Sequence, residues 1–268
     1  MSTVILLRGL TRESAHWGRF PELLHAQLPG AMVQPIDLPG NGSLNAQRSP
    51  GRIDEMARAA REQVRGLGFA PPYHLLAMSL GAMVAVEWAR QEPASLAGGV
   101  LVNTSLRPFS SWPQRLRPAN YAKLLRVAAG WGSAVRREEA VLRMTTHHVV
   151  DVAALAREWA TIRSLRPVST GNALRQLLAA ARYRAPAVAP PLPLLVLAGR
   201  GDRLVDPDCS RQLALAWGIE LREHPSAGHD LCLDDGPWVA RQMADWLARL
   251  ASQPGRLADA GLQCPGED

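Results

Sequence analysis

A serine lies at the point where a predicted strand runs directly into a predicted helix. Residues 77–81 read Ala-Met-Ser-Leu-Gly, with Ser79 at the centre and a small residue two positions away on either side. A sharp strand-to-helix turn strains its central residue, and small flanking residues leave room for that geometry. The turn would also place the hydroxyl at a helix N-terminus, where the dipole favours developing negative charge. This short pattern is common, so a serine that merely caps the helix explains it equally well.

Two further residues favour chemistry at this serine. A serine hydroxyl becomes an effective nucleophile only when a base accepts its proton. His229 lies in a predicted loop near the C-terminus, and Asp202 follows the predicted strand 194–197. The chain order Ser, Asp, His is that of one known type of catalytic triad, in which the carboxylate orients the imidazole. Asp206 is the alternative carboxylate, although Pro207 beside it indicates the start of a helix.

Acyl chemistry also needs two backbone N–H groups to hold the oxyanion. The N–H of Leu80 directly follows the serine, and the N–H of Leu10 lies in the turn after the first predicted strand, where Gly9 permits a close turn. The remaining acidic residues near His229 are expected to face solvent or to cap helices: Asp230, Asp234 and Asp235.

The elements that must position these residues follow an alternating pattern. Short apolar runs alternate with amphipathic stretches, which predicts a mostly parallel central sheet with helices on both faces. The predicted strands are 4–7, 32–36, 74–78, 99–102, 194–197 and 220–223, and the predicted helices are 14–28, 52–67, 80–91, 208–217 and 237–250.

The alternation stops in the middle of the chain. The pattern there is helical, with segments at 121–129, 134–146, 152–165 and 170–182. We therefore expect a core in two parts, a helical insertion between them and a disordered polar tail. The corresponding ranges are 1–110 and 186–251 for the core, 111–185 for the insertion and 252–268 for the tail.

Composition excludes several classes of protein. A length of 268 residues with 47% hydrophobic residues suits a globular domain with one insertion. No apolar run approaches the ~20 residues that span a bilayer, and the apolar start lacks the features of a signal peptide.

Three widely spaced cysteines argue against a disulfide framework or zinc site, so we expect the protein to lie in the reducing cytoplasm. No metal site is expected at His147 and His148, because adjacent residues on a helix point in divergent directions and Asp151 is the one acidic residue nearby.

Positive charge is concentrated in the insertion. The chain carries a net charge of +6, and Lys123 is its single lysine. Residues 107–184 hold 13 arginines and this lysine against four acidic residues, a net +10, which leaves −4 for the remainder. Arginine-biased codon usage explains this as well as a function does. A functional basic surface would attract anionic partners, and no module for binding nucleic acid is recognisable.

Jointly, these motifs resemble the α/β-hydrolase superfamily, and within it the small serine carboxylesterases of the pimeloyl-carrier-protein methyl ester esterase and MenH-like group. The resemblance spans residues 3–250 and implies an α/β-hydrolase fold, the triad Ser79–Asp202–His229 and a helical cap over the active site, inserted before the last strands. It is carried by Leu-Leu-Arg-Gly-Leu at 6–10 with Trp17, Asp-Leu-Pro-Gly-x-Gly at 37–42, Ala-Met-Ser-Leu-Gly at 77–81, Gly-Arg-Gly-Asp at 199–202 with Val205, and Gly228-His229 with Pro237.

Two positions depart from that family's pattern. The family usually has His-Gly after the first strand, where this chain has Arg8-Gly9. Ala77 stands where the family has the first glycine of the strand-to-helix turn around the serine. Arg8 could support the oxyanion turn by hydrogen bonding or place a cation near the acyl pocket. The candidate substrate contacts, of which those in the cap could instead form its core, are Arg8, Gly9, Trp17, Met78, Trp112, Trp131 and Trp159.

We therefore expect a serine hydrolase that cleaves a small-molecule carboxylic ester or thioester through an acyl-enzyme, without a cofactor or metal. Acyltransferase, lyase and C–C hydrolase activities use the same triad and remain open. A non-catalytic binding protein with a hydrolase-like fold is the alternative from another class. The basic cap and the family resemblance together suggest an acidic acyl carrier protein as a partner; neither nucleic acid nor a membrane is expected.

Overall fold

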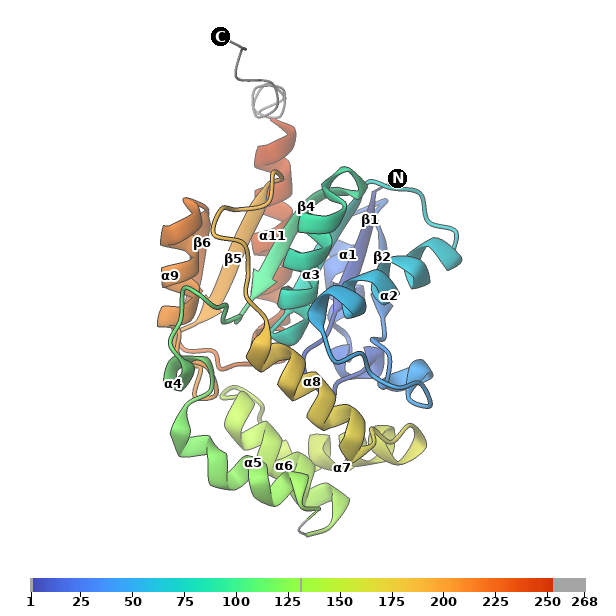
Figure 1. Ribbon diagram of the computed structural model, residues 1–268, viewed down its shortest axis with the longest axis vertical. Coiled ribbons are helices and arrows are strands. Elements are labelled where there is room, and N and C mark those ends of the chain that lie inside the picture. The colour runs from blue at the N-terminus through green and yellow to red at the C-terminus, as the bar shows by residue number, and fades with distance from the viewer. Residues whose placement is uncertain (1, 131, 253–268) are drawn as a thin grey trace.

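The chain folds around one parallel sheet. The computed structural model describes residues 2–130 and 132–252, and within these ranges six parallel strands follow the order β2-β1-β3-β4-β5-β6 (Figure 1). This confirms the predicted mostly parallel sheet. The strands are β1 (Thr3–Leu7), β2 (Met32–Ile36), β3 (Tyr73–Met78), β4 (Leu96–Val102), β5 (Leu194–Gly199) and β6 (Glu220–His224).

Helices cover both faces of the sheet, as the continuous apolar strands require. Along β1, Val4 and Leu6 point into one apolar cluster, whereas Ile5 and Leu7 point into another on the opposite face. Helices α1 and α11 pack in the first cluster and helices α2, α3 and α9 in the second (Figure 1). Their bounds are α1 (Phe20–Gln27), α2 (Ile53–Gly66), α3 (Leu80–Gln91), α9 (Asp208–Trp217) and α11 (Gly236–Ala251), with the short α10 (Leu231–Asp234) before α11.

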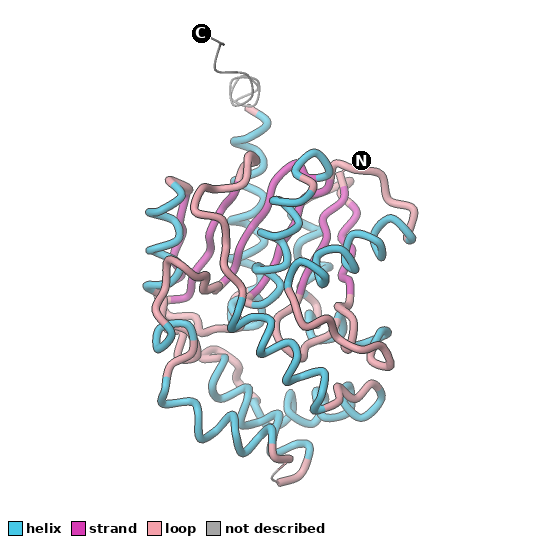
Figure 2. Tube along the Cα trace, viewed as in Figure 1, coloured by secondary structure: helices cyan, strands magenta, loops and turns pink. Residues whose placement is uncertain are grey.

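The segment between β4 and β5 contains the inserted helices. They gather beyond the end of the sheet toward which β4 points, and the tube view shows helix and loop there without strand (Figures 1 and 2). Leu142, Ala156 and Trp159 form a small apolar cluster of their own within this segment. The inserted helices are α4 (Trp112–Arg115), α5 (Tyr121–Ala128), α6 (Ala134–Thr145), α7 (Val152–Leu165) and α8 (Thr170–Arg182).

Two expectations for local structure were wrong. The single helix predicted over residues 14–28 is a 3-10 helix, Ser14–Trp17, followed by α1, because Gly18 adopts a φ of 53° between them. Helix α6 ends at Thr145, so His147 and His148 follow it in a turn and do not lie on a helix. The predicted disordered tail from residue 253 onward lies outside the described residues. No helix in the described ranges is long and apolar enough to cross a membrane.

Candidate active site

Ser79 lies at the sharp junction between β3 and α3. Its φ of 55° and ψ of −117° are rare for a residue with a side chain. The conformation is held by neighbouring strands, since the Ser79 N–H donates to the Val102 carbonyl at 2.9 Å. Gly81 permits the junction: a Cβ there would lie 2.5 Å from the carbonyl oxygen of Leu7. The strand-to-helix turn predicted from residues 77–81 is therefore present.

The turn after β1 lies directly against this serine. A Cβ built on Gly9 would lie 3.2 Å from the Ser79 Cβ and 3.7 Å from its Oγ, so the backbone of Gly9 borders the hydroxyl. Leu10 follows in the same turn. Leu80 is the first residue of α3, and the first N–H groups of a helix have no acceptor within it. Both N–H groups predicted for the oxyanion thus belong to segments that meet at Ser79.

His229 and Asp202 are brought together, although they lie in separate loops. The His229 Nδ1 and the Asp202 Oδ2 are 2.7 Å apart, and both side chains are buried. Asp202 is fixed by the N–H groups of Leu204 and Val205, which donate to its other oxygen. Burial lowers the pKa of His229, but the charge and hydrogen bond of Asp202 outweigh it, so this pKa lies above the usual 6.5.

The alternative carboxylate, Asp206, has a different role. It forms a salt bridge of 3.2 Å with Arg117 and accepts a hydrogen bond from the N–H of Asp208, the first residue of α9. Asp206 therefore lies at the start of that helix, where Pro207 had indicated it would.

Asn103 joins the end of β5 to the loop that carries His229, and its role was missed from the sequence. It follows β4 with a φ of 44° and is buried. Its Nδ2 donates to the carbonyls of Gly228 and His229 at 2.9 and 2.7 Å, and its Oδ1 accepts from the Gly199 N–H at 2.8 Å. An asparagine directly after a strand, where a positive φ is tolerated, was the available signal.

A buried ion pair connects the turn after β1 to the histidine loop, the segment between β6 and α10 that carries His229. The guanidinium of Arg8 contacts both carboxylate oxygens of Asp230, at 3.1 and 2.6 Å, and both side chains are almost fully enclosed. Asp230 was expected to face solvent or cap a helix, and that expectation was wrong, because Arg8 needs a buried counter-charge. Arg8 also lies 4.7 Å from the ring centroid of Trp17 and 3.7 Å from the sulfur of Met78.

Comparison with known proteins identifies the family of the chain. The sequence pattern of the alpha/beta hydrolase family matches residues 4–242, nearly the whole described chain. The chain belongs to the alpha/beta hydrolase family. The relatives of this hydrolase include a pimeloyl-[acyl-carrier protein] methyl ester esterase of Methylococcus capsulatus, 29% identical over 91% of this chain and 94% of the relative. Another, named as the carbamate hydrolase RutD of Variovorax paradoxus, is 28% identical over 94% of this chain and 93% of the relative.

Solved structures share the fold of this hydrolase. An esterase from Exiguobacterium antarcticum superposes with a TM-score of 0.74 at 13% identity, covering 92% of both chains. A thermophilic esterase from Thermogutta terrifontis gives a TM-score of 0.68 at 22% identity, covering 93% of this chain and 90% of the other. At these identities the likeness establishes the architecture of the hydrolase.

The inserted helices of the hydrolase are tied to the turn after β1 by a buried charge network. Arg12 donates to Glu138 of α6 at 2.7 Å, and Arg163 of α7 contacts the other carboxylate oxygen at 2.5 Å. Burial opposes ionisation of Glu138, but the two arginines outweigh it and hold its pKa below the usual value. The guanidinium of Arg12 also lies 4.4 Å from the ring centroid of Trp159, which packs edge-on against His16.

Gln176 of α8 makes a second tie to the same turn. It is fully buried, and its Oε1 accepts from the Thr11 N–H at 2.9 Å. Its Nε2 donates to Asn41 Oδ1 and Ser49 Oγ at 2.9 and 3.0 Å. Thr11 has a φ of 55°, and it directly follows Leu10. An inserted helix thus holds the backbone that carries a predicted oxyanion donor, which no local sequence signal indicated.

The other candidate contacts are scattered. Trp159 belongs to the apolar cluster of the insertion, Trp112 is exposed on α4, and Trp131 lies outside the described residues. The N–H groups of His147 and His148 both donate to Asp234, which joins the end of α6 to the histidine loop. Within the described ranges no three His, Cys, Asp or Glu side chains are arranged to hold a metal ion.

Proposed function

We propose that this hydrolase cleaves a carboxylic ester or thioester through an acyl-enzyme formed on Ser79. The 2.7 Å contact between His229 Nδ1 and Asp202 supports this most directly, together with the strained backbone geometry of Ser79. The contact uses Nδ1, which leaves the opposite nitrogen, Nε2, to act as a base. Asp202 would keep the imidazole in that tautomer and stabilise its protonated form.

The reaction would proceed in two halves. In the first, His229 takes the proton of Ser79 as its oxygen attacks the acyl carbonyl, and the N–H groups of Leu10 and Leu80 hold the oxyanion. The protonated His229 then gives its proton to the leaving alcohol or thiol, and the acyl-enzyme remains. In the second half, His229 activates a water that attacks the ester carbonyl, and the acid and the free serine are released.

Other reactions on the same residues define the alternatives. Acyltransferase, lyase and C–C hydrolase chemistry differ in the acceptor or in the bond that breaks, and the relative named as a carbamate hydrolase adds carbamates to the panel of substrates. A non-catalytic binding protein with this fold is the alternative outside enzymes. The pKa of His229, raised by Asp202 against the effect of burial, favours an enzyme, because a tuned base in a buried pair is typical of active sites.

The decisive experiment is active-site labelling by a fluorophosphonate, read by intact mass. We expect one adduct on the wild type, none on Ser79→Ala, and an unchanged adduct on Ser164→Ala, which replaces an exposed serine of α7. A wild type that is folded but unlabelled, or a labelled Ser79→Ala variant, would overturn the proposal. Turnover of matched series of esters, thioesters and carbamates by the wild type would then identify the type of bond that it cleaves.

We further propose an acidic acyl carrier protein as the source of the acyl group and the cytoplasm as the location. The net +10 of residues 107–184 supports the first, together with the carrier protein in the name of one relative. Cys209 and Cys232 are free thiols buried in the structure, which suits a reducing compartment.

A further inference from the structure

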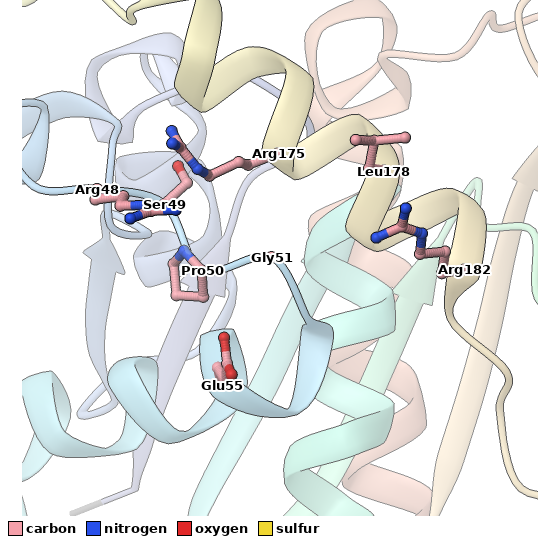
Figure 3. A pocket seen from close by; sticks show the side chains of 8 residues that line it. All are labelled: Arg48, Ser49, Pro50, Gly51, Glu55, Arg175, Leu178 and Arg182. Atoms are coloured by element: carbon pink, nitrogen blue, oxygen red, sulfur yellow. The ribbon is translucent and has the colours of Figure 1, made fainter.

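A cavity of about 430 Å³ lies apart from Ser79, His229 and Asp202. It opens between the loop after β2, the start of α2 and the side of α8 (Figure 3). Figure 3 shows Arg175 extending from α8 toward Arg48 and Ser49 of this loop, Arg182 farther along the same helix, and Glu55 on the first turn of α2. The lining residues are Arg48, Ser49, Pro50, Gly51, Glu55, Arg175, Leu178 and Arg182.

None of the three arginines of this cavity is in an ion pair with a residue that the structure describes. Within the described ranges, the guanidinium groups of Arg48, Arg175 and Arg182 form neither a salt bridge nor a hydrogen bond with another residue. Arg52, next to the cavity, is by contrast paired, since it contacts Asp54 at 2.9 Å. Three unpaired guanidinium groups around one hollow repel one another, and a bound anion would relieve that repulsion.

The balance of charge indicates the class of ligand. With three arginines and the carboxylate of Glu55, the cavity carries a net +2. A phosphate monoester carries about −1.5 to −2 at neutral pH, whereas a carboxylate carries −1. The planar guanidinium fork also matches phosphate oxygens in pairs. Pro50 and Leu178 supply apolar walls for an organic group attached to the phosphate.

The cavity walls are held together before any ligand binds. Buried Ser49 donates its N–H to Asn172 Oδ1 at 2.9 Å, and Asn172 Nδ2 donates to the Gln47 carbonyl at 2.9 Å. Gln176 adds its hydrogen bond to Ser49 Oγ. The loop and α8 are therefore one preorganised unit, which lowers the entropic cost of binding.

We propose that this cavity is a second binding site, for the phosphate monoester of a small organic molecule. Such a phosphate has two sources: the remote end of an ester substrate whose acyl group reaches Ser79, or a separate effector. Gln176 gives either source a connection to the active site, since the same side chain holds Ser49 in the cavity wall and the N–H of Thr11 beside Leu10. Binding itself does not depend on the proposed hydrolysis.

Binding is tested by calorimetric titration of the full chain with phenyl phosphate. We expect saturable binding, at least about tenfold weaker in the double variant Arg175→Ala/Arg182→Ala, since the loss of even one charge-assisted pair costs about that factor. Glu55→Gln should tighten it, and benzoate should bind about tenfold more weakly than phenyl phosphate. The matched control is Arg126→Ala/Arg157→Ala, which removes the same charge from α5 and α7 outside the cavity, and it should bind as the wild type does.

The same titration on Ser79→Ala separates this proposal from the proposed hydrolysis, because binding should persist there whatever Ser79 does. Phenyl phosphate that inhibits turnover of a phosphorylated ester, but not of a neutral one, identifies the substrate's own phosphate as the ligand. A change in turnover of the neutral ester identifies an effector. The proposal is overturned if no saturable binding is found up to about 10 mM, or if both double variants weaken binding equally while circular dichroism shows them folded.

Discussion

His229 is the residue whose environment sets the pH dependence of the proposed reaction. Its pKa is lowered by burial, raised more strongly by Asp202 and so lies above 6.5. A general base must be neutral to accept a proton, so kcat/KM should rise with pH through a midpoint above 6.5. Asp202→Asn removes the raising effect, so the midpoint should move to lower pH while the rate falls by about 10⁴-fold. The dependence of kcat/KM on pH, measured for both proteins with a neutral ester, checks this. An unshifted midpoint would show that the rise in kcat/KM reports the titration of another group.

Gln176 acts on the proposed oxyanion hole without touching the substrate. Gln176→Leu keeps the volume but leaves the Thr11 N–H without its acceptor, so the turn that carries Leu10 should loosen. We expect kcat to fall about tenfold with KM little changed, because the interaction is strongest in the transition state. Gln176→Glu keeps the acceptor and should recover part of the rate. The control is Gln212→Leu on α9; equal effects of the two leucine variants on kcat would contradict this positioning role.

Which of these residues can be found from the sequence depends on how local their signals are. Ser79 is flanked by small residues, and Asp202 and His229 follow predicted strands in the chain order Ser, Asp, His. Each of the three could therefore be predicted as a candidate catalytic residue. The role of Asp230 depends on Arg8, 222 positions away, and that of Gln176 depends on Thr11, 165 positions away. Hydrogen bonds over such separations exist only once the sheet and the inserted helices have come together.

The packing of α3 against the end of β1 depends on one glycine. An alanine at Gly81 would place its Cβ 2.5 Å from the Leu7 carbonyl and 2.7 Å from that of Arg8, and backbone cannot give way as a flexible side chain does. Gly81→Ala should destabilise the fold by about 1–3 kcal/mol and slow the labelling of Ser79. Gly66→Ala in α2 meets nothing within 4 Å and should be stabilising by up to about 1 kcal/mol. Urea unfolding of the two variants compares them; similar stability would refute the steric argument.

The ion pair between Arg8 and Asp230 links the turn after β1 to the loop before α10. Asp230→Asn leaves a buried guanidinium without a counter-charge and should cost about 3–5 kcal/mol of unfolding free energy. The double variant Arg8→Met/Asp230→Leu removes both charges and should recover most of that loss. Denaturant unfolding of the single and double variants measures the coupling, and purely additive losses would mean that the pair contributes through packing alone.

Helix α8 shows the limit of pattern reading at the scale of an element. Its bounds were predicted correctly, at residues 170–182. The face that it buries, however, is not its most apolar one. The buried positions include Asn172 and Gln176, whereas Leu174 and Leu177 are exposed. Periodicity indicates that a helix exists, but its buried face is decided by the polar partners that α8 meets on the loops after β1 and β2, which the chain supplies from elsewhere.

At the scale of the whole molecule, charge is divided between the inserted helices and the rest of the chain. If an acidic carrier protein docks on the insertion, kcat/KM for a carrier-bound ester should fall on the order of tenfold between ~0.05 and ~0.3 M salt, whereas the free ester should be unaffected. Reversing charge in the insertion with Arg126→Glu/Arg136→Glu should reduce the carrier-bound rate. The same change on the core, Arg19→Glu/Arg58→Glu, is the control, and equal losses would refute docking on the insertion.

The attachment of the insertion to the turn after β1 affects how the enzyme would distinguish substrates. Glu138 holds Arg12, and Gln176 holds Thr11, so the helices that would surround an acyl chain are anchored on the same short segment that presents Leu10. An acyl chain of the wrong shape displaces these helices only by disturbing that segment as well. Poorly fitting chains should therefore bind and yet turn over slowly, so that selectivity among acyl chains is expressed in the rate of reaction and hardly in affinity.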